Sequence, residues 1–287
     1  MNSITLLSPA KINLTLEVLG KRPDGYHEIR SIVQPINLFD EVKIDIEDGK
    51  GIRIESTGLE IPRGNENLAW KAVEVFLKES GLDLNVRLSI KKRIPLGAGL
   101  GGGSSNAAAV LVGMNRITKE FSENELIEFA PKIGADVALF INCQSAVIEG
   151  IGDKVTIIRD FPLFYYVLLN PGFGTSTKRI YEFWDEIAKG DSIRTNIEDT
   201  ISLFKDGRFP LMNDLEKAAM HLYPEIRSLK NRLLGMEVEA ASMTGSGSTV
   251  FGVFRDEEVA KRVYDYMKDS SMFRVFLAQG ISGWHRL

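Results

Sequence analysis

A glycine-rich segment carries the clearest sign of chemistry in this chain. Residues 95–105 read Pro-Leu-Gly-Ala-Gly-Leu-Gly-Gly-Gly-Ser-Ser, and an alanine-rich stretch follows them. Glycine lacks a Cβ and tolerates positive φ, so several backbone N–H groups can converge on one point. A helix that starts at Ser104 would add unpaired N–H groups and the positive end of its dipole. The segment is therefore predicted to bind phosphates, with Ser104 and Ser105 donating to their oxygens or ligating Mg²⁺.

Other phosphate-binding patterns fit this segment less well. Gly97, Gly99 and Gly102 match G-x-G-x-x-G, but residues 86–91 before them alternate apolar and polar, whereas a strand of a dinucleotide fold is apolar throughout. No Lys-Ser or Lys-Thr directly follows the glycines, as a P-loop requires. The protein-kinase motifs His-Arg-Asp and Asp-Phe-Gly do not follow either. A flexible turn without a ligand is the remaining alternative.

Composition limits the partners of the chain. Its 287 residues include 35 Lys and Arg against 39 Asp and Glu, a net charge of −4 that argues against nucleic acid. The apolar runs are too short to span a bilayer, and no secretory signal is visible, so we expect no membrane partner. The single cysteine, Cys143, cannot form an internal disulfide, which favours a reducing, cytoplasmic location.

Apolar periodicity predicts the elements that must position the loop. Alternation predicts strands at residues 42–46 and 52–54, joined as a hairpin by a turn at 48–51, and another strand at 86–91. Predicted helices cover residues 68–77 with a stop at Gly81, residues 104–117, and a segment opened by a Ser122/Glu125 capping box and shortened by Pro131. Strands at 164–169, 250–254 and 275–277 and a helix at 257–268 follow.

Three motifs together resemble one superfamily. The glycine segment resembles the second motif of the galactokinase, homoserine kinase, mevalonate kinase and phosphomevalonate kinase superfamily (GHMP kinases). Residues 8–14 and 243–249 are similar to its N-terminal motif and its C-terminal glycine motif, in the expected order. The resemblance implies an α+β chain with the two-domain GHMP kinase fold. Residues 1–158 would form a ribosomal protein S5 domain 2-like, ATP-binding domain, and residues 159–287 a ferredoxin-like α/β domain.

The block Leu-Gly-Lys-Arg-Pro-Asp-Gly-Tyr-His-Glu at 19–28 narrows the resemblance. It is similar to the branch that uses ATP and Mg²⁺ to phosphorylate the 2-hydroxyl of a small-molecule substrate, a cytidine-diphosphate-linked methylerythritol, in the non-mevalonate isoprenoid route. The resemblance assigns Asp136 as general base and Lys11 as the ammonium that keeps it ionised and stabilises the transferring group. The sequence alone does not show that these two side chains meet.

The resemblance also implies the contacts of both ligands. Tyr26 and Tyr181 would sandwich the cytosine while His27 bonds to its edge, and Asn13, Thr177 and Gly245 would contact the rest of the substrate. Asn65 contacts adenine or, like Asn67, caps a helix. The remaining ATP-binding residues would be Pro95, Leu96, Gly97, Ala98, Gly99, Leu100, Gly101, Gly102, Gly103, Ser104 and Ser105.

Two other functions stay open at this stage. The chain could be another GHMP small-molecule kinase, of homoserine or mevalonate type, although those substrates carry no base that needs an aromatic clamp. It could also be a catalytically silent nucleotide-binding regulator, against which Lys11 and Asp136 argue. No cluster of metal-ligating side chains is predicted, so Mg²⁺ would be held mainly by phosphate oxygens. We expect a monomer or a weak homodimer.

Overall fold

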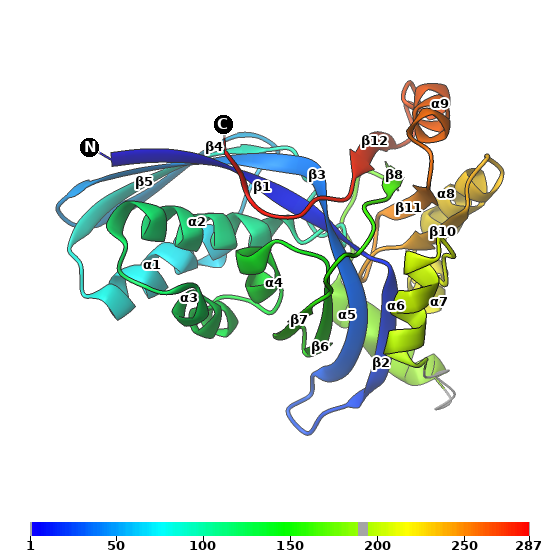
Figure 1. Cartoon of the computed structure of the whole chain (residues 1–287), viewed down its shortest axis with the longest axis horizontal. Helices are drawn as coiled ribbons and strands as arrows, with labels where there is room; N and C mark the ends of the chain where they lie inside the picture. Colours follow the sequence, from blue (N-terminus) through cyan, green and yellow to red (C-terminus); the bar gives the residue numbers. More distant parts are fainter. Residues whose placement is uncertain (1, 189–194, 287) are drawn as a thin grey trace.

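The computed structural model describes residues 2–188 and 195–286, which form two halves along the long axis of the molecule (Figure 1). In the first half, helices cover one face of a large sheet. Its strands are β1 (Asn2–Asn13), β2 (Thr15–Lys21), β3 (His27–Asp48), β4 (Gly51–Gly58), β5 (Leu84–Lys92), β6 (Ala146–Gly150) and β7 (Lys154–Ile157). Its helices are α1 (Leu68–Ser80), α2 (Gly102–Thr118), α3 (Glu123–Phe129) and α4 (Val137–Asn142), with short 3₁₀ turns at Gly64–Glu66 and Ala130–Lys132.

The second half is built on a smaller antiparallel sheet. Its elements are β8 (Tyr165–Asn170), α5 (Thr177–Ile187), α6 (Ile197–Lys205), β9 (Met212–Asn213), α7 (Glu216–Leu222), α8 (Pro224–Leu234), β10 (Ala240–Met243), β11 (Val250–Phe254), α9 (Glu257–Met267), β12 (Arg274–Gln279) and β13 (His285–Arg286). The strand order β10-β11-β8-β12 places β8, the first of the four strands of this sheet, between β11 and β12, the third and the fourth. This is the ferredoxin-like order, so the predicted α+β fold class is confirmed for this half.

The predicted hairpin between β3 and β4 is wrong. Asp48 of β3 pairs with Leu84, and Gly51 of β4 pairs with Asn85, so β5 lies between the two strands. Burial explains the order, because β5 buries alternate residues completely while β4 keeps Ile52 only partly covered. The more apolar strand takes the inner position and the more polar strand takes the edge.

The predicted end of α1 and the predicted start of α3 are confirmed, whereas α2 starts earlier than predicted. Gly81 ends α1 in the left-handed conformation (φ 69°), and both hydrogen bonds of the Ser122/Glu125 capping box form at α3. After α3 the chain tightens into the 3₁₀ turn that contains Pro131, as expected for a proline late in a helix. Helix α2 begins at Gly102, two residues before the predicted start, because its N-cap residue lies within the glycine segment.

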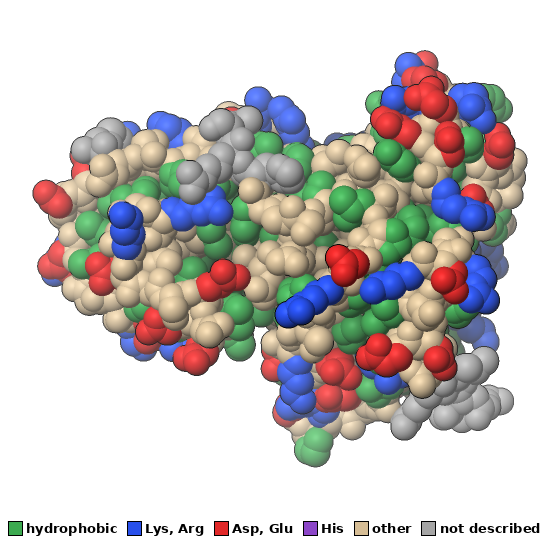
Figure 2. Space-filling view, viewed as in Figure 1, with side chains coloured by type: hydrophobic (Ala, Val, Ile, Leu, Met, Phe, Trp, Pro, Cys, Tyr) green, Lys and Arg blue, Asp and Glu red, His purple; other side chains and the backbone are tan. Residues whose placement is uncertain are grey.

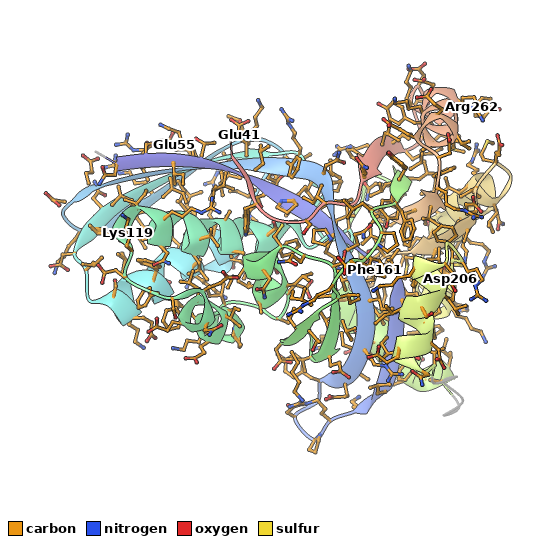
Figure 3. All side chains as sticks on the ribbon, in the orientation of Figure 1. Glu41, Glu55, Lys119, Phe161, Asp206 and Arg262 are labelled. Carbon is orange, nitrogen blue, oxygen red and sulfur yellow. The ribbon has the colours of Figure 1, made fainter. Side chains whose placement is uncertain are left out.

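Helix α2 packs closely on the large sheet. A Cβ on Gly113 of α2 would lie 2.3 Å from Ile44 Cδ1 of β3, so this glycine lets the helix approach the strand. A second apolar cluster joins the halves, with Ile12 and Ile32 from the first half and Phe251 from the second. Phe161, labelled in Figure 3, belongs to this cluster, where the two halves meet. Helix α2, which follows the glycine segment, is thus packed directly on β3.

Two strands of the second half complete the large sheet. β9 pairs in parallel with β2 at Thr15, and β13 pairs with β1 at Leu6. Between β12 and β13 the chain crosses α4, where Gly283 N–H donates to Cys143 O (2.7 Å) and Trp284 Nε1 donates to Ile141 O (3.0 Å). The division at 158/159 stays a prediction, since the two segments share a sheet.

Acidic and basic side chains are interspersed on the face shown in Figure 2, in keeping with the small net charge. Among the helices of residues 2–188 and 195–286, none is long and apolar enough to cross a membrane.

Candidate active site

A cleft of about 1000 Å³ lies where β1, the β2–β3 connection, the glycine segment, the start of α4 and α5 come together. It brings together residues that are up to 235 positions apart in the sequence, from Lys11 to Ser246. The predicted site residues that line it are Lys11, Asn13, Tyr26, His27, Gly97, Gly99, Gly101, Ser104, Asp136, Thr177, Tyr181 and Gly245. Groups predicted for catalysis, phosphate binding and base recognition therefore share one cavity.

The glycine segment reaches this cleft because it has no side chains at two tight contacts. Gly99 (φ 76°) lies against the C-terminal glycine segment, where a Cβ would stand 2.0 Å from Thr244 O. Gly101 (φ 68°) is the N-cap of α2, and a Cβ there would stand 3.0 Å from both Lys11 Cγ and Phe140 Cε2. Both backbone conformations favour glycine. The two glycine segments and β1 thus meet backbone to backbone at the start of α2.

Some predicted nucleotide-binding residues do not line the cleft. Ala98 and Leu100 point into the apolar cluster between the halves, being 2% and 1% exposed. Ser105 is fully buried and its Oγ accepts a hydrogen bond from Ser8 Oγ (2.7 Å), so the predicted phosphate contact by this hydroxyl is not available in this structure. The others outside the cleft lining are Pro95, Leu96, Gly102, Gly103 and Asn65.

Asn65 and Asn67 take different positions before α1. Asn67 is the N-cap of α1, and its Oδ1 accepts from Ala69 N–H (2.9 Å), which is the capping alternative. Asn65 is exposed in the preceding 3₁₀ turn, and its contact with adenine stays a prediction.

A buried ion pair between Lys92 and Asp40, which was not predicted from the sequence, contacts residues on both sides of the glycine segment. Lys92 Nζ lies 2.5 Å from Asp40 Oδ2, and both side chains are almost completely buried. Asp40 Oδ1 also accepts from Arg93 N–H (2.7 Å) and Ile94 N–H (2.9 Å), and Asn106 of α2 donates to Oδ2 (3.0 Å). Burial lowers the pKa of Lys92, while the Asp40 charge opposes this shift. In the sequence, Lys92 stands in a run of basic residues that is typical of a solvated face, so nothing there indicates the pair.

Lys11 and Asp136 face the same cleft from β1 and from the residue before α4. Lys11 is 5% exposed, and its Nζ donates to Asn13 Oδ1. Burial lowers the pKa of Lys11, and the negative charge of Asp136 opposes this shift, so the two groups interact through space. A Cβ on Gly152 would lie 3.3 Å from Asp136 Oδ1, and the bare backbone there leaves room for the carboxylate.

Asn13 connects this charged centre to the second half. Its backbone N–H donates to Thr244 Oγ1 (3.0 Å), and its Nδ2 donates to Ser31 Oγ (2.8 Å). Thr244 in turn donates to Gly99 O (3.2 Å). The predicted substrate residue Asn13 thereby fixes the position of Lys11 relative to both glycine segments.

Aromatic rings line the far end of the cleft. His27 stacks on Tyr181 (ring centroids 4.6 Å apart) and meets the edge of Trp184 (5.7 Å). Because His27 covers one face of Tyr181, a base that stacks on Tyr181 must use its other face. Tyr26 is 63% exposed, unusually high for a large apolar ring, and is free to stack on a ligand. Burial raises the pKa of Tyr181, and the charges of Asp136 and Asp214 add to this, so its phenol stays neutral.

Charged residues that were not among the predicted site residues also line this end of the cleft. They are Lys21, Asp24, Lys178, Glu182 and Asp185. Asp185 Oδ1 lies 2.7 Å from His27 Nε2, and Asp185 Oδ2 lies 2.5 Å from Lys21 Nζ. Asp185 is 158 residues from His27 and stands among other charged residues of α5, so no local pattern links it to the site.

Comparison with known proteins agrees with this geometry. The profile described as GHMP kinases N terminal domain matches residues 67–144, and the profile described as GHMP kinases C terminal matches residues 195–271. The chain therefore belongs to the GHMP kinase family.

Within that family, two curated relatives that align with nearly the whole chain carry the same name. A protein of Geobacter sp. (strain M21) is 43% identical over 262 residues, which are 91% of this chain and 93% of that protein. A protein of Syntrophotalea carbinolica is 37% identical over 284 residues, which are 97% of this chain and 99% of that protein. Both are named 4-diphosphocytidyl-2-C-methyl-D-erythritol kinase.

Solved structures give the same result. The crystal structure of a 4-(cytidine 5'-diphospho)-2C-methyl-D-erythritol kinase matches with a TM-score of 0.84 and 30% identity, covering 98% of this chain and all of that one. A homoserine kinase from Cytophaga hutchinsonii matches with a TM-score of 0.75 at 20% identity over 98% of this chain and 95% of its own, which shows the shared fold alone.

Proposed function

We propose that this chain is a small-molecule kinase that transfers the γ-phosphoryl group of ATP to the 2-hydroxyl of 4-diphosphocytidyl-2-C-methyl-D-erythritol, in the non-mevalonate route to isopentenyl diphosphate. The observation that carries this proposal is the single cleft in which the glycine segment, the Lys11 and Asp136 pair and the aromatic residues around His27 meet. The names of relatives at 37–43% identity support the choice of substrate.

The triphosphate of ATP would lie over Gly99, Gly101 and Ser104, at the start of α2. There the unpaired N–H groups of the helix and its dipole favour negative charge. The Ser104 hydroxyl faces the cleft and can donate to a phosphate oxygen. The buried Asp40 and Lys92 pair holds Ile94 and Asn106 on either side of the loop, which keeps the cradle in place before the nucleotide arrives.

The acceptor hydroxyl needs a base and a positive charge beside it. The Asp136 carboxylate would accept the hydroxyl proton as the oxygen attacks the γ-phosphorus. Lys11 would stabilise the negative charge on the transferring group, because its ammonium is nearly buried and so little screened by water. Asn13 Oδ1 accepts a hydrogen bond from that ammonium and so orients it.

Mg²⁺ is part of the proposal. Magnesium prefers a few carboxylate or hydroxyl oxygens together with phosphate oxygens and water. Ser104 lines the cleft beside the glycine segment, and its hydroxyl would hold the ion with the nucleotide. No group of three or more acidic, His or Cys side chains suited to a metal is found in residues 2–188 and 195–286. When bound, Mg²⁺ neutralises charge on the phosphates.

The cytosine would enter between Tyr26 and the face of Tyr181 that His27 does not cover, and the predicted bond from His27 to the edge of the base would require the imidazole to leave its stack on Tyr181. Thr177, whose Oγ1 lies 2.8 Å from Ser246 Oγ, and Gly245 would contact the diphosphate and the alcohol. A cytoplasmic location and a monomer or weak homodimer stay predictions.

A substrate panel with ATP and Mg²⁺ tests this function. The diphosphocytidyl alcohol, homoserine and mevalonate are compared at equal concentrations, with phosphorylated product as the readout. We expect turnover of the cytidyl compound alone. Turnover of homoserine or mevalonate in its place would assign another activity, and ATP binding with no turnover of any of the three would support a regulator. Gly101→Val should abolish ATP binding in a nucleotide titration, because a side chain there meets Lys11 and Phe140.

A further inference from the structure

Asn213, the last residue of β9, is bonded to two carbonyl groups of the C-terminal glycine segment. Its Nδ2 donates to Met243 O (2.7 Å) and to Gly245 O (2.8 Å), and its Oδ1 accepts from Leu215 N–H (3.0 Å). Carbonyl oxygens only accept hydrogen bonds, so the amide serves both of them only with its NH₂ group turned toward them. The three bonds fix the Asn213 side chain in one orientation.

The backbone around Asn213 is anchored to the first half of the chain. Asn213 pairs with Leu16 of β2, Asp214 N–H donates to Leu16 O (2.9 Å), and Asp214 Oδ2 accepts from Val18 N–H (2.8 Å). Leu16 lines the cleft, whereas Asn213 is not among the lining residues. Asn213 therefore holds the glycine segment at a set position relative to a strand that forms part of the cleft wall.

The bond to Gly245 O determines the direction of the next N–H group. The peptide bond between Gly245 and Ser246 is trans, so its C=O and its N–H point in opposite directions. The carbonyl points to Asn213, outside the cleft, while Gly245 and Ser246 both line the cleft. The Ser246 N–H thus points to the cleft side. Within residues 2–188 and 195–286 no acceptor for this N–H is found, so it is free to donate to a ligand.

The neighbours of this N–H indicate which ligand it serves. Ser246 Oγ lies 2.8 Å from Thr177 Oγ1, and Thr177 is the first residue of α5. Thr175 Oγ1 donates to Ser246 O (3.1 Å), which fixes the next peptide group as well. An oriented N–H beside two hydroxyl groups suits the oxygen of a phosphate. Because α5 also carries Tyr181, this phosphate belongs to the substrate that receives the phosphoryl group and not to ATP, whose proposed place is at the start of α2.

We propose that Asn213 is a positioning residue for the acceptor substrate: by holding the Gly245 carbonyl away from the cleft, it directs the Ser246 N–H at a phosphate oxygen of the substrate's diphosphate. This inference rests on the proposed function, in which the acceptor places its diphosphate beside Thr177 and Gly245. Asn213 does not touch the ligand and acts through the main chain. Without the amide, the Gly245–Ser246 peptide is free to turn its carbonyl oxygen toward the phosphate, where two acceptors face each other and binding is weakened.

Steady-state kinetics of Asn213→Asp test the proposal. The carboxylate has nearly the size of the amide but cannot donate, so neither carbonyl is held. We expect the KM for the diphosphocytidyl alcohol to rise roughly 10-fold or more, about the effect of one hydrogen bond to a charged group, with kcat and the KM for ATP close to wild type. A merely structural role would reduce the amount of active enzyme, and hence kcat, without changing the KM for the alcohol.

The matched control is Asn231→Asp, which makes the same change on an exposed residue of α8 and should leave all three kinetic constants unchanged. An unchanged KM for the alcohol in Asn213→Asp would overturn the proposal. A rise in the KM for ATP in its place would also overturn it, because the N–H would then serve the nucleotide.

Binding measurements separate this inference from the proposed function, because they need no turnover. Cytidine 5'-diphosphate and cytidine are titrated into wild-type enzyme and Asn213→Asp. The variant should bind the diphosphate roughly 10-fold more weakly and cytidine equally well, since cytidine carries no phosphate. Equal weakening of both ligands would overturn the role of Asn213. If wild-type enzyme binds the diphosphate but does not phosphorylate the cytidyl alcohol, the proposed function fails, while the role of Asn213 is still decided by the two affinities.

A second pair of variants keeps the test decisive if Asn213→Asp does not fold. Ser246→Pro removes the N–H itself, whereas Ser246→Ala removes only the hydroxyl and keeps the N–H. The KM for the cytidyl alcohol should be roughly 10-fold higher in Ser246→Pro than in Ser246→Ala. Equal KM values in these two variants would show that the N–H does not bind the substrate.

Discussion

Gly99 and Thr244, 145 residues apart, touch backbone to backbone. The Thr244 hydroxyl donates to Gly99 O (3.2 Å), and a Cβ on Gly99 would lie 2.0 Å from Thr244 O. The loop assigned to ATP and the glycine segment of the second half are thus one packed unit. Whatever moves one of them moves the other.

Gly99→Ala should therefore reduce both stability and nucleotide binding. The new methyl group meets a backbone oxygen that cannot move aside, and alanine disfavours a φ of 76°. We expect the free energy of unfolding to fall by at least about 1–3 kcal/mol. Gly103→Ala is the control for stability in urea unfolding, because its Cβ would lie 3.7 Å from Leu68 Cδ1, an ordinary contact. Equal stability of both variants would contradict the close packing.

Asp40→Asn should destabilise the protein through Lys92. Removing the negative charge leaves a buried ammonium without its counterion, which costs about 3–5 kcal/mol. The double variant Asp40→Asn/Lys92→Met should recover much of that loss, because the uncompensated charge is gone. Denaturant unfolding of the three proteins measures the effect. If the double variant is no more stable than Asp40→Asn, the ion pair is not the cause.

Asp136→Asn should lower kcat while ATP still binds. The amide keeps the size of the side chain but cannot accept the hydroxyl proton, and general-base catalysis contributes about 10²–10⁴-fold. Steady-state kinetics and a nucleotide titration measure the two quantities. Glu128→Gln, an exposed carboxylate on α3, should leave both unchanged. Full turnover by Asp136→Asn would show that Asp136 is not the general base.

Lys11→Met should be inactive and more stable than wild type at neutral pH. Burial lowers the pKa of Lys11 below its ordinary value of 10.5, so the folded state binds this proton less tightly than the unfolded state. At pH values below the folded-state pKa, the buried positive charge lowers the free energy of unfolding by its full amount. As pH rises through the folded-state pKa, Lys11 loses its proton and this destabilisation becomes smaller. The stability difference between Lys11→Met and wild type should narrow from pH 7 toward the ordinary value of 10.5. A difference that stays constant across this range would show that Lys11 is not desolvated.

Tyr26→Ala should raise the KM for the cytidyl substrate far more than the KM for ATP. Stacking of a base on an aromatic ring contributes about 1–3 kcal/mol, and Tyr26 presents an exposed ring to the cleft. Tyr266→Ala is the control, since Tyr266 is 76% exposed on α9 and does not line the cleft. Equal rises in both KM values would show that Tyr26 does not stack on the base.

Local signals in the sequence predicted local structure well. The Ser122/Glu125 capping box and the Gly81 stop each depend on residues within one turn of a helix, and both form as expected. The order of the strands was harder to predict from the sequence. The turn after Asp48 looks like a hairpin between β3 and β4, but the strand that pairs with both of them, β5, lies more than 30 residues further along the chain.

The same limit applies to the site. The family motifs located Lys11 and Asp136, and the structure places them in one cleft. Asp185 and the buried pair of Asp40 and Lys92 were missed, since a single charge in a helix or strand reads as solvated until its partner is known. Ser105 was predicted to bind phosphate because it follows the glycines and Ser104. In the helix its side chain points in a different direction from that of Ser104, and its Oγ contacts Ser8 Oγ.

The contributions of β9 and β13 to the large sheet have a consequence for biosynthesis. The ribosome releases β1 and β2 long before Met212 and Arg286 exist to pair with them. A nascent chain halted near residue 158 would expose unpaired strand edges, where other chains can add. Expressed as a fragment, that segment should aggregate, and co-expression of the remaining residues should keep it dispersed.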